Sequence, residues 1–190
     1  AYAALPGGSE TPHPDAVNAA EQRGFGSPAQ FVYGEAAPGP VGHVLRAFEL
    51  HNDDVFMDLG SGRGRLVLGA ACMPVDAAGA CGRAVGVELD KNRHDLAIRA
   101  AELLGATPRP YTLLNDDMLT TPMSEATVAF SNNVVFGARL NGALATSLCL
   151  ARAPRLRSVI TTAPLPLSDA SAAGLSLQRV SVIPVNWSSA

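Results

Sequence analysis

Aromatic residues, charged residues and cysteines are all scarce in this chain of 190 residues. Aromatics make up 5% and charged residues 16%, while hydrophobic residues reach 47%, a balance that excludes a disordered chain. The net charge of −3 lacks the basic signature of autonomous nucleic-acid binding, so at most a weak or indirect nucleic-acid contact is expected. Long apolar runs are missing as well, which excludes a membrane-spanning segment and predicts no membrane partner.

Cysteine and histidine are too few and too scattered to form a disulfide framework or a metal site. The three cysteines have small or apolar neighbours, which favours reduced, buried thiols over disulfides or catalytic thiols. The four histidines show no spacing typical of metal ligands. We therefore expect no metal site.

The length fits one domain with a small appendage. Residues 1–30 are rich in Gly, Pro, Ser and Ala, which predicts an N-terminal arm that is loose or partly helical. Residues 31–190 are expected to form the catalytic domain.

Within that domain, short apolar runs alternate with segments of helical period. The predicted strands are 55–59, 84–89, 111–115, 127–130, 156–162 and 176–185, and the predicted helices are 41–50, 65–73, 91–104 and 138–150. This alternation predicts an α/β fold with a doubly wound, mainly parallel sheet. Ligands of such sheets bind beyond the carboxyl ends of the strands, so the residues that follow each strand are the candidates for a site.

The first strand runs into a glycine-rich turn, DLGSGRG (58–64). Gly60, Ser61 and Gly62 would let a ligand lie against the backbone at the start of a helix. A tight turn or a dinucleotide site would use the same pattern. Asp58 argues against a pyrophosphate, which a nearby carboxylate would repel, and favours a ligand that carries an ammonium or sulfonium group.

The next two strands also end in acids. Glu88 could accept hydrogen bonds from both hydroxyls of a ribose, although a solvent-facing charge is the alternative. Asp117 could accept from an adenine amino group, with Asp116 as its equivalent, and a helix N-cap is the alternative for this pair. Met118 offers an apolar face to the ring. Together these residues predict a pocket for S-adenosylmethionine, with S-adenosylhomocysteine as product.

The fourth strand is followed by two adjacent amides in FSNNVVFG (130–137). Asparagine is a poor strand former and is costly in a core unless its amide is hydrogen-bonded. A plain turn is one interpretation. The other is that Asn132 orients an attacking amine without bearing charge, while Asn133 supports the turn.

The chain resembles the non-SET histone lysine methyltransferases named for disruption of telomeric silencing, which have the Rossmann-like class I methyltransferase fold. The resemblance runs from about residue 25 to the end. It rests on VYGE (32–35), DLGSGRGRLVL (58–68), VGVELD (85–90), NDDML (115–119), SNNVVFG (131–137) and the ITTAPLPL and VNW segments (160–167, 185–187).

The resemblance implies roles that composition cannot assign. It places Tyr33 and Glu35 in a loop that closes over the methionine end of the donor. It makes Asn132, Tyr33 and Trp187 the candidate catalytic residues, with Asn132 also at the cofactor. The apolar walls of the lysine channel would be Phe130, Phe136, Ile160 and Trp187.

Some positions depart from the family pattern. Ala36 and Ala37 replace two hydroxyl residues that would donate to the donor carboxylate. Arg65 stands where the family often has Gln; it would bind that carboxylate instead, or be a solvated helix residue. The family's last antiparallel strand, which carries a channel tyrosine, would follow Trp187, and we expect the catalytic domain to lack it. The basic segment that anchors relatives to nucleosomes is also missing from this sequence.

The resemblance implies methylation of a lysine of histone H-three in the nucleosome by direct in-line transfer, and a nuclear location. The alternatives are a lysine methyltransferase of a non-histone protein and a non-catalytic scaffold that keeps the fold. A nicotinamide-dependent oxidoreductase is disfavoured by Asp58. The oligomeric state is left open.

Overall fold

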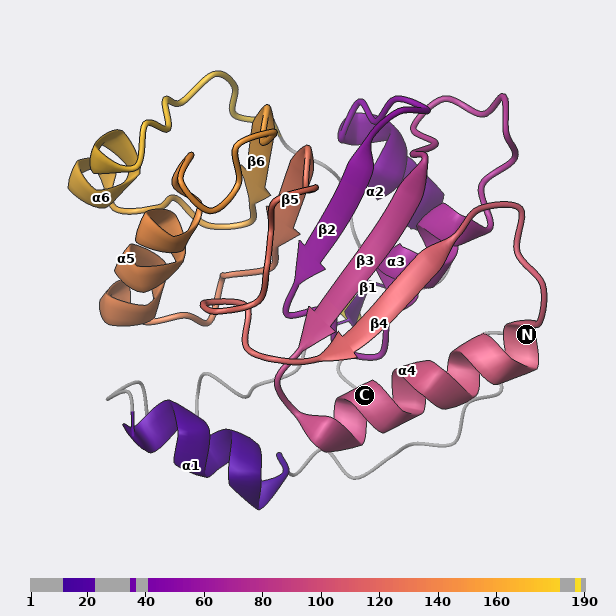
Figure 1. The fold of residues 1–190 in the computed structure, drawn as a ribbon, viewed down its shortest axis with the longest axis horizontal. Helices are drawn as coiled ribbons and strands as arrows, with labels where there is room; N and C mark the ends of the chain where they lie inside the picture. The colour runs from indigo at the N-terminus through magenta and orange to yellow at the C-terminus, as the bar shows by residue number, and fades with distance from the viewer. Residues whose placement is uncertain (1–11, 23–34, 37–40, 182–186, 189–190) are drawn as a thin grey trace.

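A five-stranded parallel sheet forms the centre of this computed structural model, which describes residues 12–22, 35–36, 41–181 and 187–188 (Figure 1). Its order is β4-β3-β2-β5-β6, and every neighbouring pair is parallel. The strands are β2 (Val55–Leu59), β3 (Arg83–Glu88), β4 (Tyr111–Asn115), β5 (Val128–Ser131) and β6 (Ser158–Thr161). The chain reverses direction of winding between β2 and β5, so the predicted doubly wound α/β fold is confirmed.

Alternate strand residues build a core on each face of the sheet. Phe56 of β2 packs on one face with Leu45 and Val67, which come from α2 (Val41–Ala47) and α3 (Arg65–Ala71). Its neighbour Met57 packs on the opposite face with Leu144 of α5 (Ala138–Ser147). Helices therefore cover both faces, as burial of two apolar faces requires.

Helix α4 (Lys91–Leu104) has the bounds that the sequence predicts, because both of its ends carry local signals. The Asp90 side chain accepts a hydrogen bond from the Arg93 N–H at 2.9 Å and caps the first turn. At the other end Gly105, at φ 73°, accommodates a backbone turn that other residues rarely adopt. Figure 1 shows α4 along the lower edge of the sheet, where the strand arrowheads end.

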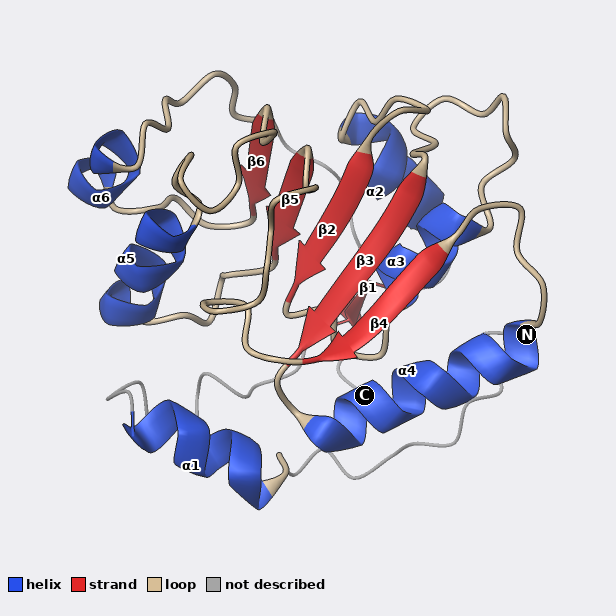
Figure 2. Cartoon of the chain, in the orientation of Figure 1, coloured by secondary structure: helices blue, strands red, loops and turns tan. Residues whose placement is uncertain are grey.

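The predicted strand at 176–185 is wrong over its described part. Residues 176–181 form a loop after α6 (Leu167–Ala172), drawn in tan in Figure 2, and 182–185 lie outside the described residues. Leu177 and Val180 are 76% and 80% exposed. Apolar side chains favour a strand where they become buried against neighbours, and these two stay exposed.

The N-terminal part contributes helix α1 (Pro14–Gln22), beneath the carboxyl ends of the strands (Figure 1). The His13 N–H donates to the second carboxylate oxygen of Asp90 at 2.5 Å, which ties this segment to the start of α4. The short strands β1 (Glu35–Ala36) and β7 (Trp187–Ser188) pair antiparallel. None of the described helices has the length and apolar character needed to cross a membrane.

A buried carboxylate joins three strands at the amino end of the sheet. Asp54, 3% exposed, precedes β2 and accepts hydrogen bonds from the Thr127 hydroxyl at 2.7 Å and the His51 N–H at 2.7 Å. The Arg157 guanidinium adds two more donors. Burial alone would raise the pKa of Asp54, but the hydrogen bonds from Arg157, Thr127 and His51 outweigh it and hold the pKa below its ordinary value.

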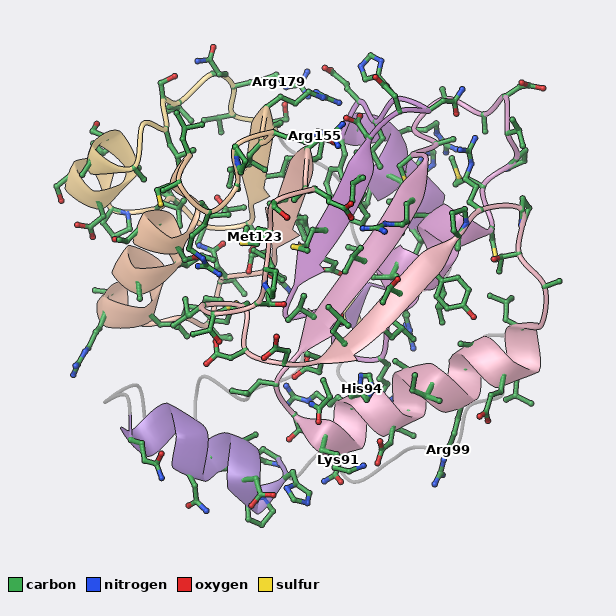
Figure 3. The ribbon with its side chains drawn as sticks, viewed as in Figure 1. Lys91, His94, Arg99, Met123, Arg155 and Arg179 are labelled. Carbon is green, nitrogen blue, oxygen red and sulfur yellow. The ribbon has the colours of Figure 1, made fainter. Side chains whose placement is uncertain are left out.

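This amino end is remote from α4. Figure 3 shows Arg155 and Arg179 at the top of the view, and Lys91 and Arg99 on α4 at the bottom. The guanidinium of Arg179 pairs with Glu49 at 2.5 Å in the same upper region. The Asp54–Arg157 and Glu49–Arg179 pairs thus lie at the amino end of the sheet, away from the end at which a ligand is expected.

Replacing Asp54 with Asn should lower the free energy of unfolding at pH 7 by about 2 kcal/mol, because charge-assisted hydrogen bonds to a buried group are lost. A carboxylate with a lowered folded pKa stabilises the protein above its unfolded pKa of 3.8. The difference between wild type and variant should therefore shrink as the pH falls below that value. Urea unfolding at pH 7, 5 and 3.5 measures it.

The matched control is Asp53→Asn, because Asp53 is the adjacent and exposed acid. This change should shift stability by no more than about 0.5 kcal/mol. Equal losses in the two variants would contradict the structural role of Asp54.

Candidate ligand site at the carboxyl ends of the strands

The glycine-rich turn after β2 is held by hydrogen bonds to β3. The N–H groups of Gly60 and Ser61 both donate to the Val87 carbonyl, at 2.8 and 2.9 Å. The Gly62 N–H donates to a Glu88 carboxylate oxygen at 2.7 Å, and the Gly64 N–H donates to the Ser61 carbonyl at 2.9 Å. Gly60, Gly62 and Gly64 all have positive φ, which explains why glycine occupies alternate positions.

These bonds decide what the turn can bind. A pyrophosphate needs several free N–H groups, but four N–H groups of this turn already have partners within the protein. At the same time, a Cβ added to Gly60 would meet nothing within 4 Å. The backbone at Gly60 is thus open to an approaching group while its amide proton is engaged, which suits van der Waals contact better than anion binding.

Asp58 and Glu88 form a buried acidic pair next to this turn. Asp58 is 3% and Glu88 6% exposed. Asp58 lies in register with Gly86 on β3, where an added Cβ would meet the Ser61 hydroxyl oxygen at 2.8 Å. Ser61 therefore fills the space beside Asp58 that a larger residue on β3 would take.

The two carboxylates differ in how well the protein compensates their charge. Glu88 accepts from the Gly62 N–H and from the Asp90 N–H, at 2.7 and 2.8 Å. Burial still raises the pKa of Glu88, because these hydrogen bonds offset it only in part. Burial, with a smaller contribution from the charge of Glu88, raises the pKa of Asp58 to about 8. Among the described residues no donor contacts the Asp58 carboxylate, which makes it the better receptor for a cationic group.

At the third strand end the two aspartates shape a turn. The Asp117 carboxylate accepts from the Leu119 N–H at 2.7 Å, and Asp116 accepts from the Asp117 N–H at 2.8 Å. These hydrogen bonds stabilise a turn over residues 118–120 and not a helix N-cap, because no described helix begins between β4 and β5. Both acids are half-buried, as is Met118, which packs beside the core cluster around Met57. Their roles toward a ligand stay predictions.

The amide pair after β5 has two distinct environments. Asn133 is fully buried; its Nδ2 donates to the Asn141 Oδ1 at 2.7 Å and to the Ala163 carbonyl at 3.0 Å, and its Oδ1 accepts from the Ala163 N–H at 2.8 Å. Asn132 is half-buried, and its Oδ1 accepts from the Thr162 hydroxyl at 2.8 Å. The structure thus gives Asn133 the supporting role expected of it and leaves Asn132 partly accessible.

Three of the four predicted channel residues have described side chains, and these three do not share one environment. Phe130 is 5% exposed and its ring centroid lies 4.9 Å from that of Phe48, in the core under α2. Ile160 is paired with Phe130 in the sheet and is half-buried against the same cluster. Phe136 is half-buried on the opposite side, with the cluster around Met57. Their assignment as channel walls stays a prediction.

The remaining predicted site residues are described in part. Tyr33 lies outside the described residues. The backbones of Glu35 and Trp187 are brought together, because Glu35 pairs with Ser188 and Ala36 pairs with Trp187 in the β1–β7 ladder. Arg65 is the first residue of α3 and is half-buried. Within the part of the chain that is described, no group of three His, Cys, Asp or Glu side chains is arranged to hold a metal ion.

Three polar residues at this edge were not predicted as site residues. Ser131 donates from its hydroxyl to the Leu59 carbonyl at 2.9 Å, Thr162 contacts Asn132, and Asp90 both caps α4 and donates its N–H to Glu88. Their positions at the ends of strands were the available signal. Ser131 and Thr162 bond residues of other strand ends, which sequence spacing does not show, whereas Asp90 bonds Glu88 and Arg93 close to it in the chain.

The comparison with protein families gives one match. The family described as "Histone methylation protein DOT1" matches residues 14–171, which is most of the chain and includes every strand of the sheet.

Solved structures share the fold at low identity. A magnesium protoporphyrin IX methyltransferase from Synechocystis PCC 6803 with bound SAM matches with a TM-score of 0.53 at 19% identity, over 79% of this chain and 74% of that one. A dimethyladenosine transferase from Plasmodium falciparum has a TM-score of 0.51 at 14% identity, over 66% and 41%. An RNA methyltransferase from Salinibacter ruber in complex with S-adenosyl-L-homocysteine has a TM-score of 0.44 at 30% identity, over 58% and 66%. The present chain therefore spans less than two thirds of the last two.

Replacing Asp58 with Asn should flatten the dependence of stability on pH. The unfolded chain releases the Asp58 proton near pH 3.8, whereas the folded protein holds it up to about pH 8. Between these values the unfolded state binds fewer protons, so rising pH lowers wild-type stability, by at most about 1.4 kcal/mol per pH unit. Urea unfolding at pH 5 and 7.5 should show that the free energy of unfolding of the variant, relative to that of the wild type, is higher at pH 7.5 than at pH 5.

Asp76→Asn serves as the control, because Asp76 is an exposed acid. Its stability profile should run parallel to that of the wild type. A parallel profile for Asp58→Asn would show that Asp58 is ionised in the folded protein.

Proposed function

This chain belongs to the DOT1 family of histone methylation proteins, and from that premise we propose that it transfers a methyl group from S-adenosylmethionine to a lysine of histone H-three in the nucleosome. The proposal includes a nuclear location and nucleosomes as partners. Its support is the family match over residues 14–171 together with the chemistry of the site at the strand ends.

One observation carries the proposal: the carboxylate of Asp58 is buried, and no hydrogen-bond donor from the described part of the chain contacts it. A buried acid is costly unless it is paired or stays protonated. S-adenosylmethionine carries a sulfonium and an ammonium group, and a cation beside Asp58 would favour its ionised form. The engaged N–H groups of the glycine turn support the same choice, because they disfavour a phosphate ligand at this position.

The other strand ends would hold the rest of the donor. Each Glu88 oxygen accepts one hydrogen bond from the backbone and retains a lone pair for a ribose hydroxyl. Asp117, or its neighbour Asp116, would accept from the adenine amino group, with Met118 against the ring. Gly60, Ser61 and Gly62 would form the surface on which the donor lies.

The methionine end of the donor would be enclosed by Tyr33, Glu35 and Arg65. In this arrangement Arg65 would bind the donor carboxylate, since Ala36 and Ala37 provide no hydroxyl groups. Trp187 would join them, and the pairing of its backbone with Ala36 supports a shared location.

When bound, S-adenosylmethionine supplies an electrophilic methyl group on its sulfonium. The target lysine has an ordinary pKa of about 10.4 and must be neutral to attack. Apolar walls from Phe130, Phe136, Ile160 and Trp187 would favour the neutral amine by desolvation. Asn132 would orient that amine toward the methyl carbon, at the reacting distance of about 3–3.5 Å that such transfers need.

The first test is label transfer from tritiated S-adenosylmethionine. Intact nucleosomes and free core histones are incubated side by side with wild type, Asp58→Asn and the exposed control Asp76→Asn. We expect label on histone H-three of the nucleosomes with wild type and control, and at least about a tenfold loss with Asp58→Asn, corresponding to 1.4 kcal/mol or more.

Other outcomes would contradict parts of the proposal. Label on free histones alone would remove the requirement for the nucleosome. Donor binding by calorimetry without label on any histone would indicate a non-histone substrate. An absence of donor binding would overturn the proposal that the protein is a methyltransferase enzyme and would favour the non-catalytic scaffold.

Donor affinity should also depend on pH in a defined direction. Below about pH 8 the Asp58 carboxyl holds a proton, which a cationic ligand must displace, so affinity should rise with pH by up to about tenfold per unit and level off near pH 8. The ligand's own amino group titrates in the same range. The readout is therefore the ratio of dissociation constants between Asp58→Asn and wild type, measured by calorimetry at pH 6, 7 and 8; a constant ratio would exclude proton displacement at Asp58.

A further inference from the structure

A threonine at the end of β6 contacts the amide to which the proposed function assigns the orienting role. Thr162 directly follows β6, and its hydroxyl donates to the Oδ1 of Asn132 at 2.8 Å. We propose that Thr162 is a positioning residue that fixes the Asn132 amide for methyl transfer. This inference rests on the proposed function and adds a residue to its site.

The geometry gives the amide one orientation. The same hydroxyl oxygen also lies 3.3 Å from the Oδ1 of Asn133, but a hydroxyl has a single proton to donate, and the 2.8 Å contact is the better hydrogen bond. With the Thr162 proton on it, the Asn132 Oδ1 keeps one lone pair. That lone pair is available to accept an N–H of an incoming amine, while the amine's own lone pair stays free to attack.

Thr162 is held in place by its neighbour. The buried amide of Asn133 accepts from the Ala163 N–H at 2.8 Å and donates to the Ala163 carbonyl at 3.0 Å. Both backbone polar groups of the residue after Thr162 are therefore fixed by Asn133. Asn133 is itself fixed by Asn141 of α5 at 2.7 Å, and Asn141 donates to the Phe136 carbonyl at 2.8 Å. The threonine therefore rests on a buried, fully bonded support.

A second bond ties this assembly to the glycine turn. Ser131, which precedes Asn132, donates to the carbonyl of Leu59 at 2.9 Å, and Leu59 precedes Gly60. Hydrogen bonds thus connect the ends of β2, β5 and β6. The Asn132 amide is held relative to the turn on which the donor would lie, as a reaction that depends on distance requires.

Thr162 is exposed, so loss of its hydroxyl should change the stability of the protein little. A structural role would lower the melting temperature when the hydroxyl is removed, whereas a positioning role would lower kcat alone. Thr162→Val removes the hydroxyl and keeps the shape, Thr162→Ser keeps the hydroxyl, and Thr146→Val is the matched control. Thr146 is an exposed threonine on α5 whose hydroxyl donates to the Gly142 carbonyl at 2.9 Å.

The kinetic experiment measures kcat for label transfer to nucleosomes, the donor dissociation constant and the melting temperature for each protein. We expect Thr162→Val to lower kcat about tenfold with an unchanged donor dissociation constant and melting temperature, and Thr162→Ser to restore at least half of kcat. Thr146→Val should match the wild type. Wild-type kcat in Thr162→Val would overturn the proposal, and so would a loss that Thr162→Ser fails to restore.

A measurement without activity tests the contact directly. The side-chain amide signals of Asn132 are assigned in nitrogen–proton correlation spectra by their loss in Asn132→Asp. They should move in Thr162→Val and stay near their wild-type positions in Thr162→Ser and Thr146→Val. Unmoved signals in Thr162→Val would overturn the inference even if label transfer works, whereas an inactive wild type with moved signals would overturn the proposed function and leave the contact established.

Discussion

The carboxylate of Glu88 is the contact on which the site depends. One of its oxygens holds the Gly62 N–H of the turn after β2, and the other holds the Asp90 N–H at the start of α4. Two segments that leave neighbouring strands are thereby fixed by one side chain that is 6% exposed. The same burial brings its charge close to Asp58 and contributes to the raised pKa there. Glu88 thus positions the turn and adds to the effect of burial on the pKa of Asp58.

Burying two acids side by side lowers the stability of the folded protein, and both acids lie at the carboxyl ends of the strands. Two buried acids with raised pKa values destabilise the folded protein near neutral pH. The buried acid at the amino end of the sheet has a lowered pKa instead. Asp54 is also buried there, but Arg157, Thr127 and a backbone N–H compensate its charge. Both ends carry buried aspartates, but among the described residues only Asp54 has a cationic hydrogen-bond partner, whereas Asp58 has a raised pKa.

Sequence reasoning succeeded where the signals were local. Helix α4 has its predicted bounds because Asp90 and Gly105 mark its ends, and β2 and β4 match because short apolar runs are bounded by polar turns. It failed at 176–181, where the apolar side chains of Leu177 and Val180 stay exposed and no strand forms. It also missed α6 and the two-residue strands β1 and β7. Thr162 was the last residue of a predicted strand, yet its partner Asn132 is 30 residues away in the chain, and only the parallel sheet brings them together.

The same geometry explains why an amide, and not a third acid, follows β5. Strand β5 lies directly beside β2, and Phe130 is in register with Asp58, so Asn132 lies at the same edge of the sheet as the acidic pair. A carboxylate there would add like charge to two acids whose pKa values are already raised. An amide provides a hydrogen-bond acceptor without charge, but it lacks the strong field that fixes an ionised group. Neighbouring groups must therefore orient the amide. The inferred source of this orientation is the Thr162 hydroxyl, which is held in place by the buried Asn133 through Ala163.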